Sequence, residues 1–478
     1  MNPLFSGVLG SAVLALFLSG HTVGHAAEKP HDIDQLWQII QQQQQQIDAL
    51  NRKLDAQAEQ IAVSNQSPAT PARGRKQDSG LESPDIKEVA RKTNILGQEV
   101  EKLRTALVIP EEKALKSAYG LGPAASKIYQ TDKGLSIGGY GEAYYRNYVT
   151  DNASSSDTAD MYRQVIYLGY RFNDNILFNS ELEFEHGSTG SGGTVSVEFA
   201  NVDFLLDPRL NVRAGMVLSP MGFINQIHEP NTFFGNIRPK VEQTIIPSTW
   251  REMGVGLFGQ LSPGLTYTTY VMNGLNAANF SASGIRSGRQ NGSKVKAEDL
   301  AWVGRLDYTF PSHQGLSLGA SVYLGDSGQS QTFSGTRADV FTQLYEGHVQ
   351  WRYRGLEFRA LGAYGHIDDA GVLSAAKGET VGESNYGWYT ELGYNILPLI
   401  LKDTGQYLAP FVRYEHYDSI AKAPAGYSDD LSKDQEIYQI GLQYKPIPNV
   451  VVKADYRNFT AEQGSVADEF NLGLGYVF

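Results

Sequence analysis

The chain has 478 residues, no cysteine and a formal net charge of −12. Without cysteine it can form no disulfide framework, no cysteine metal site, no iron–sulfur cluster and no lipid-modified cysteine. The acidic balance argues against nucleic acid as a partner, because phosphate binding requires a basic face. A mean hydropathy of −0.32, with a single long apolar run at the start of the chain, excludes a bundle of transmembrane helices. A membrane β-barrel stays open, since its lipid-facing residues alternate with polar ones.

The first residues predict an export signal. Residues 8–18 form an apolar run of eleven, too short to span a bilayer, and small residues follow at 24–27. We expect a signal peptide over residues 1–26, although no Lys or Arg precedes the run. A buried core helix is the alternative. Export without cysteine favours a bacterial periplasm or outer membrane.

Two segments with a seven-residue apolar repeat come next. The first places apolar residues at the same heptad position, namely Ile33, Ile40, Ile47, Leu54 and Ile61. This period predicts coiled coils over 27–63 and 86–109, joined by a Pro-containing, basic linker at 64–85 and followed by a connector at 110–133. A narrow apolar stripe cannot be buried by one helix alone, so we predict self-association. The heptads leave dimer and trimer open, and a single helix packed on its own chain is the alternative.

The composition changes near residue 134. All but two of the 27 Tyr and all but two of the 20 Phe lie in 134–478. Runs of about ten residues there alternate apolar and polar side chains, which is the period of a β-strand. In the run 176–186, Phe178, Leu182 and Phe184 fall on one face, while the other face carries an asparagine and three glutamates. One face suits lipid and the other suits water.

Short and long connections alternate along this region. Seven short turns, such as 173–175 and 262–264, alternate with eight longer polar segments, and this pattern requires sixteen strands. It predicts an all-β transmembrane barrel of sixteen antiparallel strands over 134–478. A secreted β-sandwich or propeller is the alternative. It is disfavoured because Glu, Arg, Gln and Asp occupy the second face of strand after strand and are too many to bury.

A barrel of this size encloses a water-filled lumen, so the predicted function is passive diffusion of small hydrophilic solutes or ions. Residues 220–249 form the longest loop and carry four Pro with several large apolar side chains. We expect this loop to fold into the lumen and narrow it. Its candidate constriction charges are Glu229, Arg238, Lys240 and Glu242.

Strand alternation directs further charged side chains towards the lumen, where fixed charges set ionic preference. The candidate pore-lining residues are Arg146, Arg213, Arg305, Arg352, Arg354, Arg359, Arg413, Arg457, Glu181, Glu183 and Glu185. For each of them the alternative role is pairing across neighbouring strands, which only keeps the lumen hydrated.

These features resemble Gram-negative trimeric porins with an N-terminal periplasmic coiled coil. The segment 237–240 (Ile-Arg-Pro-Lys), the segment 247–252 (Pro-Ser-Thr-Trp-Arg-Glu) and the following 254–257 (Gly-Val-Gly-Leu) are similar to porins of the phosphate-selective O/P type. The resemblance implies a homotrimer in outer-membrane lipid and recognition of the terminal Phe478 by the outer-membrane assembly machinery. It also implies an anion preference carried by Arg238 and Lys240, while the glutamates of the wall leave cation preference open.

The sequence leaves two rival functions open. A barrel enzyme would need a nucleophile and a base close together, and the best candidates are His186 with Ser188, or His366 with Asp368 and Asp369. No serine-centred elbow, paired-histidine motif or phosphate-cradling loop accompanies them, so we expect no enzyme, no catalytic residue, no metal site and no cofactor. The other rival is a structural tether, in which the coiled coil reaches another envelope layer and the barrel is only an anchor.

Overall fold

The computed structural model describes residues 115–149, 156–187, 189–190, 192–401 and 404–478. The predicted signal peptide (1–26), both coiled-coil segments (27–63 and 86–109) with their linker (64–85), and Ser188 lie outside these residues. A tether role would depend on these coiled-coil segments, which therefore lie outside the described residues as well. Within the described ranges, no helix is long and apolar enough to cross a membrane.

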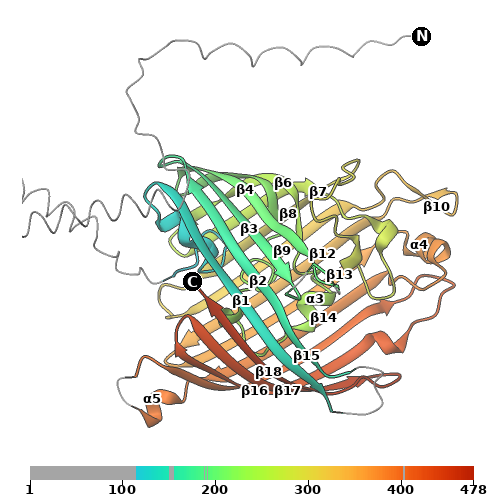
Figure 1. Ribbon diagram of the computed structural model, residues 1–478. Helices are drawn as coiled ribbons and strands as arrows, with labels where there is room; N and C mark the ends of the chain where they lie inside the picture. Colours follow the sequence, from blue (N-terminus) through green and yellow to red (C-terminus); the bar gives the residue numbers. More distant parts are fainter. Residues whose placement is uncertain (1–114, 150–155, 188, 191, 402–403) are drawn as a thin grey trace, which may run out of the picture. The chain divides into compact units, whose positions relative to one another are not determined.

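Sixteen antiparallel strands close into a barrel, in which each strand pairs with its neighbours along the chain and β1 pairs with β18 (Figure 1). The predicted sixteen-stranded barrel is confirmed. Its strands are β1 (Gly134–Tyr148), β2 (Thr158–Arg171), β3 (Ile176–Glu185), β4 (Val195–Asp207), β5 (Leu210–Leu218), β6 (Arg251–Ser262), β7 (Leu265–Asn273), β8 (Leu300–Thr309), β9 (Leu316–Asp326), β12 (Phe341–Tyr353), β13 (Leu356–Ile367), β14 (Ser384–Tyr394), β15 (Tyr407–Lys422), β16 (Asp434–Ile447), β17 (Val450–Ala461) and β18 (Glu469–Val477).

The connections hold the remaining short elements. β10 (Thr332–Phe333) and β11 (Thr336–Arg337) form a separate two-stranded sheet. The helices are η1 (Ala125–Gln130), η2 (Pro230–Thr232), α3 (Lys240–Thr244), η3 (Ala277–Asn279), η4 (Arg286–Gly288), α4 (Ala370–Lys377), α5 (Leu397–Ile400) and η5 (Leu431–Lys433). Short turns gather at one end of the barrel, called the turn end, together with α5 and the C-terminus; the long loops, with β10 and α4, form the opposite loop end (Figure 1).

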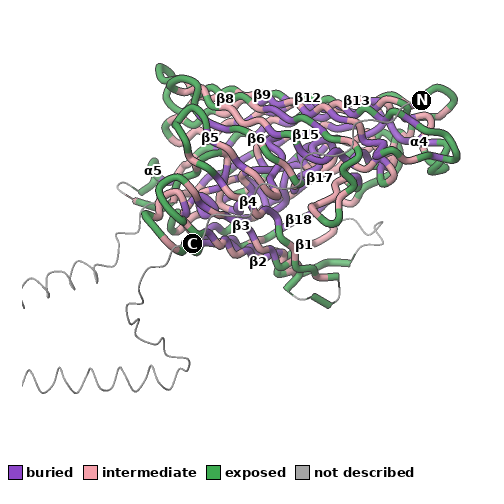
Figure 2. Tube along the Cα trace, turned by 90° about the horizontal axis from the view of Figure 1, so that it is seen from above, coloured by how far each residue is buried: buried purple, intermediate pink, exposed green. Residues whose placement is uncertain are grey.

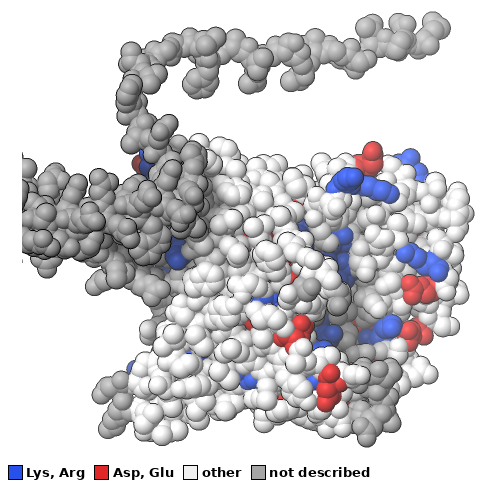
Figure 3. Space-filling model, in the orientation of Figure 1, with Lys and Arg blue, Asp and Glu red and all other residues white. Residues whose placement is uncertain are grey.

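Side chains alternate between the two faces of the wall, as a strand period of two requires. In β3, Asn179, Glu181 and Glu183 are buried on the inner face, whereas Phe184 points outwards and is 38% exposed. Outward residues of other strands, such as Ile440 and Leu472, are also exposed and apolar. Buried residues accordingly concentrate inside the wall (Figure 2), and much of the visible side wall carries no charged side chain (Figure 3). This distribution suits a barrel surrounded by lipid.

Long loops fill part of the lumen with apolar side chains. Loop L3 (residues 219–250, between β5 and β6) buries Val241, Ile246 and Trp250 in a cluster with the inner faces of β7–β9 and β12–β16. Loop L4 (residues 274–299, between β7 and β8) adds Phe280 and Ile285 to the same cluster. Packing on this side of the wall leaves polar space beside β1–β4, β6, β17 and β18.

Residues 115–131, called the inner segment, also lie inside the barrel. Leu121, Ala124 and Ile128 are buried, and η1 contacts β1, β2 and β3. Asn179 of β3 donates a hydrogen bond to the carbonyl of Ala125 at 2.9 Å. The stretch expected to be a simple connector therefore occupies the lumen near the turn end, and this position brings it against loop L3.

Candidate functional site

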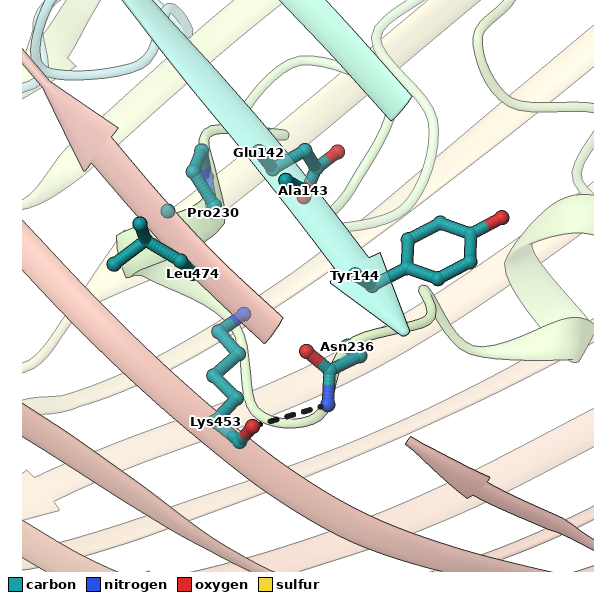
Figure 4. Close-up of a pocket in the computed structure, with 8 residues that line it drawn as sticks. Glu142, Ala143, Tyr144, Pro230, Asn236, Lys453 and Leu474 are labelled. Carbon is teal, nitrogen blue, oxygen red and sulfur yellow. Dashed lines mark hydrogen bonds between the residues drawn. The ribbon is translucent and has the colours of Figure 1, made fainter. Parts of the chain in front are cut away.

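Loop L3 folds back into its own barrel, as predicted, and is attached there by polar contacts. The Lys453 ammonium on β17 donates to the carbonyls of Phe233 at 3.0 Å and Gly235 at 2.8 Å. Asn236 donates to Asp455 Oδ2 from its backbone at 2.8 Å and from its side chain at 2.6 Å. Its amide also reaches the carbonyl of Lys453 at 3.5 Å (Figure 4). These contacts hold the middle of the loop against β17.

A cavity of about 550 Å³ lies between loops L3 and L4 and the wall. Eight basic and five acidic side chains line it, so the lining carries a formal net charge of +3. The basic residues are Arg146, Arg163, Arg238, Lys240, Arg251, Arg286, Arg289 and Arg457, and the acidic residues are Glu142, Glu183, Glu185, Glu198 and Glu469. Although the whole chain is acidic, the inside of the barrel is electropositive at this point.

The arginines on the strands are neutralised by carboxylates. The pairs are Arg163 with Glu142 (3.0 Å) and Glu183 (3.6 Å), Arg251 with Glu198 (3.2 Å), Arg457 with Glu469 (3.1 Å) and Arg146 with Glu469 (3.9 Å). Pairing across neighbouring strands, the alternative role, therefore accounts for the predicted residues Arg146 and Arg457.

The basic residues on the loops are different. Among the residues that the structure describes, no carboxylate oxygen lies within 4.0 Å of Arg238, Lys240, Arg286 or Arg289. The guanidinium groups of Arg238, Arg286 and Arg289 converge on residues 243–249 of L3, where they meet backbone carbonyls and one hydroxyl but form no ion pair with a carboxylate.

The guanidinium contacts to that stretch are made with backbone and hydroxyl oxygens. Arg289 donates to the carbonyls of Pro247 at 3.1 Å and Thr249 at 2.5 Å, and Arg238 donates to the Thr249 hydroxyl at 3.1 Å. Burial and the neighbouring Arg286 lower the pKa of Arg289 to about 9. The guanidinium therefore stays charged at neutral pH.

Apart from Glu229 and Glu242, the predicted site residues fall into three groups. Those that line the cavity are Arg146, Glu183, Glu185, Arg238, Lys240 and Arg457. Those that hold the loops or the inner segment in place are Arg213, which donates to the Tyr129 hydroxyl of the inner segment at 2.8 Å, Arg305 and Arg359, which donate to the L3 carbonyls of Gly222 at 2.5 Å and Thr232 at 2.6 Å, and Arg413, which donates to the carbonyl of Phe234 at 2.7 Å. Glu181, Arg352 and Arg354 form the third group, whose members are not part of the cavity lining.

Arg352 and Arg354 lie at the turn end. Arg352 is half-exposed and pairs with Glu357 at 3.4 Å. Arg354 stands in the tight turn between β12 and β13 with a positive φ of 49°, and its side chain is exposed. The turn takes Arg354 out of the strand alternation, so the expectation that it lines the lumen is corrected. Glu181 is buried beneath the cavity and contacts His228 of L3.

Glu229 and Glu242 were expected as constriction charges, but both carboxylates are used inside the protein. Glu229 accepts hydrogen bonds from the backbone N–H groups of Ala124 at 2.9 Å and Ala125 at 3.2 Å, and so joins L3 to the inner segment. Glu242 accepts from the backbone of Ile224 and from the Tyr389 hydroxyl, each at 2.7 Å. Both side chains are fully buried because these partners draw them away from the cavity.

Sequence reasoning missed Arg286 and Arg289 as site residues. Loop L4 also carries Leu275, Phe280 and Ile285, which are large apolar residues in a polar loop. Large apolar residues in a polar loop are the same signal that predicts the inward fold of L3, and they point to an inward fold of L4 as well. Glu198 and His228 were also missed, because their proximity depends on a contact between β4 and L3.

The residues considered for a barrel enzyme lie in ordinary pairs. His186 contacts Asp160 at 2.7 Å, and His366 contacts Asp368 at 3.0 Å. All four side chains are at least partly exposed. His366 and Asp368 are therefore in contact, as that candidate requires, whereas Ser188, the candidate partner of His186, lies outside the described residues.

The buried Glu229 makes a pH-dependent contribution to stability. Burial raises the pKa of this carboxyl from 4.5 to about 7, so the folded protein binds its proton more tightly than the unfolded chain does. The free energy of unfolding therefore falls as the pH rises through this range. We expect Glu229→Gln to reduce this loss between about pH 5 and pH 8 by up to about 3 kcal/mol. Thermal unfolding of the folded barrel at the two pH values measures it.

The matched control for this experiment is Glu379→Gln, which removes an exposed carboxyl of loop 368–383. We expect the control to retain the pH dependence of the wild-type protein. An unchanged pH dependence in Glu229→Gln would contradict the contribution assigned to Glu229.

No family model matches the chain. Among solved structures, OmpF of Salmonella typhi in complex with daunomycin matches with a TM-score of 0.51 at 14% identity, over 73% of this chain and 99% of OmpF. The outer-membrane channel DcaP of Acinetobacter baumannii matches with a TM-score of 0.46 at 15% identity, over 72% of this chain and 97% of DcaP. The anion-selective porin from Comamonas acidovorans has a TM-score of 0.45 at 12% identity, over 72% of this chain and 99% of that porin.

The match to OmpF agrees with the porin-like fold of the barrel. A sequence relative gives a stronger connection. An uncharacterized protein of Aquifex aeolicus (strain VF5) is 38% identical over 392 residues, which cover 79% of this chain and 87% of the relative. The chain described here belongs to the same protein family as this Aquifex aeolicus protein.

Proposed function

We propose that this chain is an outer-membrane channel for passive diffusion of small hydrophilic solutes, with a preference for anions. The observation that carries the proposal is the cluster of loop residues Arg238, Lys240, Arg286 and Arg289, which line the cavity and form no ion pair with a carboxylate of the described residues. Fixed charges in a narrow space with little water attract ions of opposite sign and repel ions of the same sign. The net charge of +3 in the lining therefore favours anions.

The loops support a selective rather than a wide channel. Loops L3 and L4 pack on one side of the lumen, and the inner segment fills part of the turn end. A permeating solute is thus directed along the polar side, where the basic cluster lies. Small anions fit this geometry better than large neutral solutes.

The assembly proposed for the channel is a homotrimer in outer-membrane lipid, with the loop end outside the cell and the turn end in the periplasm. The apolar outer face of the barrel supports the lipid environment. Phe478 is exposed at the end of β18, and its backbone N–H donates to the Gly139 carbonyl at 2.9 Å. Its accessible ring supports recognition by the assembly machinery.

The test is a planar-bilayer recording of the purified full chain under a KCl gradient. We expect conductance in steps of three and a reversal potential of the sign given by chloride permeation. Cation preference would contradict the role assigned to the basic cluster. No conductance from an oligomer that is folded, as shown by heat-dependent mobility on a gel, would contradict the channel itself.

A further inference from the structure

A buried group of three side chains connects L3 to the wall beneath the cavity. Glu181 of β3, Glu198 of β4 and His228 of L3 place one potential metal-ligating atom each within 4.8 Å of the other two. His228 Nε2 lies 3.1 Å from Glu181 Oε1 and 3.4 Å from Glu198 Oε2. The three residues are at most 2% exposed. They come from three different elements, so only the folded barrel assembles them.

The hydrogen-bond chemistry of this group is incomplete. His228 Nδ1 lies 3.2 Å from the carbonyl oxygen of Asn225. Because a carbonyl oxygen can only accept, Nδ1 carries the proton and Nε2 of the neutral ring presents a lone pair. That lone pair faces two carboxylate oxygens, which are also acceptors. Three acceptors this close together need a cation between them, either a proton or a metal ion.

A further observation favours a metal ion over a proton. Glu181 Oε2 and Glu198 Oε2 are buried and have no hydrogen-bond partner among the described residues. Glu198 uses its other oxygen to accept from Arg251 at 3.2 Å. Each glutamate therefore keeps one oxygen without a partner, and that of Glu198 is the atom that lies 3.4 Å from His228 Nε2.

The geometry suits a small transition-metal ion. In a tetrahedral zinc site with bonds of about 2.1 Å, neighbouring ligand atoms are about 3.4 Å apart. The two distances from His228 Nε2 are close to this value. Glu198 also lines the 550 Å³ cavity, which provides a path for the ion and space for a water molecule as a fourth ligand.

We propose that Glu181, Glu198 and His228 form a binding site for one Zn²⁺ ion per chain, which links L3 to β3 and β4. Zinc binding at this site does not require that the protein conducts ions. The nearby Arg163, Arg238 and Arg251 oppose a cation, so we expect weaker binding than in a closed structural zinc site.

The test is isothermal titration of ZnCl₂ into the full chain in detergent, purified without a polyhistidine tag and stripped of metal. We expect one Zn²⁺ per chain for the wild-type protein near neutral pH. We expect His228→Gln to lower the affinity for Zn²⁺ about 100-fold or more. Mutating a residue that only hydrogen-bonds to a ligand lowers metal affinity about 10- to 100-fold, and removing a ligand itself should cost more. Glu181→Gln provides a second variant with the same expected loss.

The matched control is His416→Gln. His416 contacts one carboxylate, Asp434, at 2.8 Å, and we expect this variant to bind Zn²⁺ like the wild-type protein. Heat-dependent gel mobility verifies that each variant is folded. No zinc uptake by the folded wild-type protein would show that a proton holds the group together and would overturn the proposal. Equal binding by the wild-type protein and both site variants would place the zinc elsewhere and would overturn it as well.

Discussion

Replacing Arg286 and Arg289 together by glutamate is expected to reverse the ionic preference of the proposed channel. The two substitutions replace two positive charges by two negative ones, and so change the net charge of the cavity lining from +3 to −1. Both guanidiniums belong to L4 and face the cavity without carboxylate partners among the described residues. The reversal potential in a KCl gradient should change sign, and the milder Arg286→Gln/Arg289→Gln pair should bring it closer to zero.

The control makes the same change of charge outside the cavity. Arg337 lies on the exposed β11 and Arg354 lies in an exposed turn, so Arg337→Glu/Arg354→Glu should leave the anion preference nearly unchanged. If both double variants shift the reversal potential equally, the total charge of the protein, rather than the cavity, controls selectivity. A folded L4 variant with unaltered reversal potential would contradict the assignment of these two arginines.

The second large effect is expected from Arg413→Met, which removes the central cation of a buried network. The Arg413 guanidinium donates to Glu391 Oε2 at 2.8 Å from Nε, to Gln439 at 2.8 Å and to the L3 carbonyl of Phe234 at 2.7 Å. It also lies 3.7 Å from Glu415. Its loss leaves two buried carboxylates without their main partner, which costs about 3–5 kcal/mol in comparable cases.

The expected result is a lower thermal midpoint for the folded barrel and a larger, less steady single-channel conductance. The second effect follows because L3 loses an anchor to β15. Arg352→Met is the matched control, since Arg352 pairs with Glu357 but its side chain is 51% exposed. Exposed pairs contribute about 0–1 kcal/mol, so this variant should unfold close to the wild-type temperature. A stable Arg413→Met protein with wild-type conductance would show that L3 is held by its other contacts.

Local patterns account for what the sequence predicted well. The sequence of each strand predicts which of its faces is apolar and which is polar, because side chains two positions apart share a face. In β3, Phe178 belongs to the apolar face and Glu181 to the polar face. Turn residues such as Pro263 and Gly264 mark the strand ends. The number of strands therefore follows from neighbouring residues alone. The lumen also contains charged residues predicted from alternation, including Arg146 and Arg457.

The site depends on contacts that no local pattern encodes. Glu229 has the sequence context of an exposed loop carboxylate, yet it bonds to Ala124 and Ala125, more than one hundred positions earlier. Arg286 reaches the carbonyl of Gln243 only because two separate loops meet inside the barrel. Alternation predicts which charged side chains lie inside the wall, but it does not predict which of them form ion pairs. The ion pairs depend on distances between side chains in the folded barrel.

The position of the inner segment has a consequence for the order of events during assembly. The hydrogen bonds described for residues 115–131 to the wall and to L3 involve β2–β5 and L3, and the Tyr119 ring lies 5.2 Å from the ring of Phe258 on β6. All these partners precede β18 in the chain. The segment can therefore dock on a growing sheet before β18 closes against β1. The barrel is thus built around a part of its own chain.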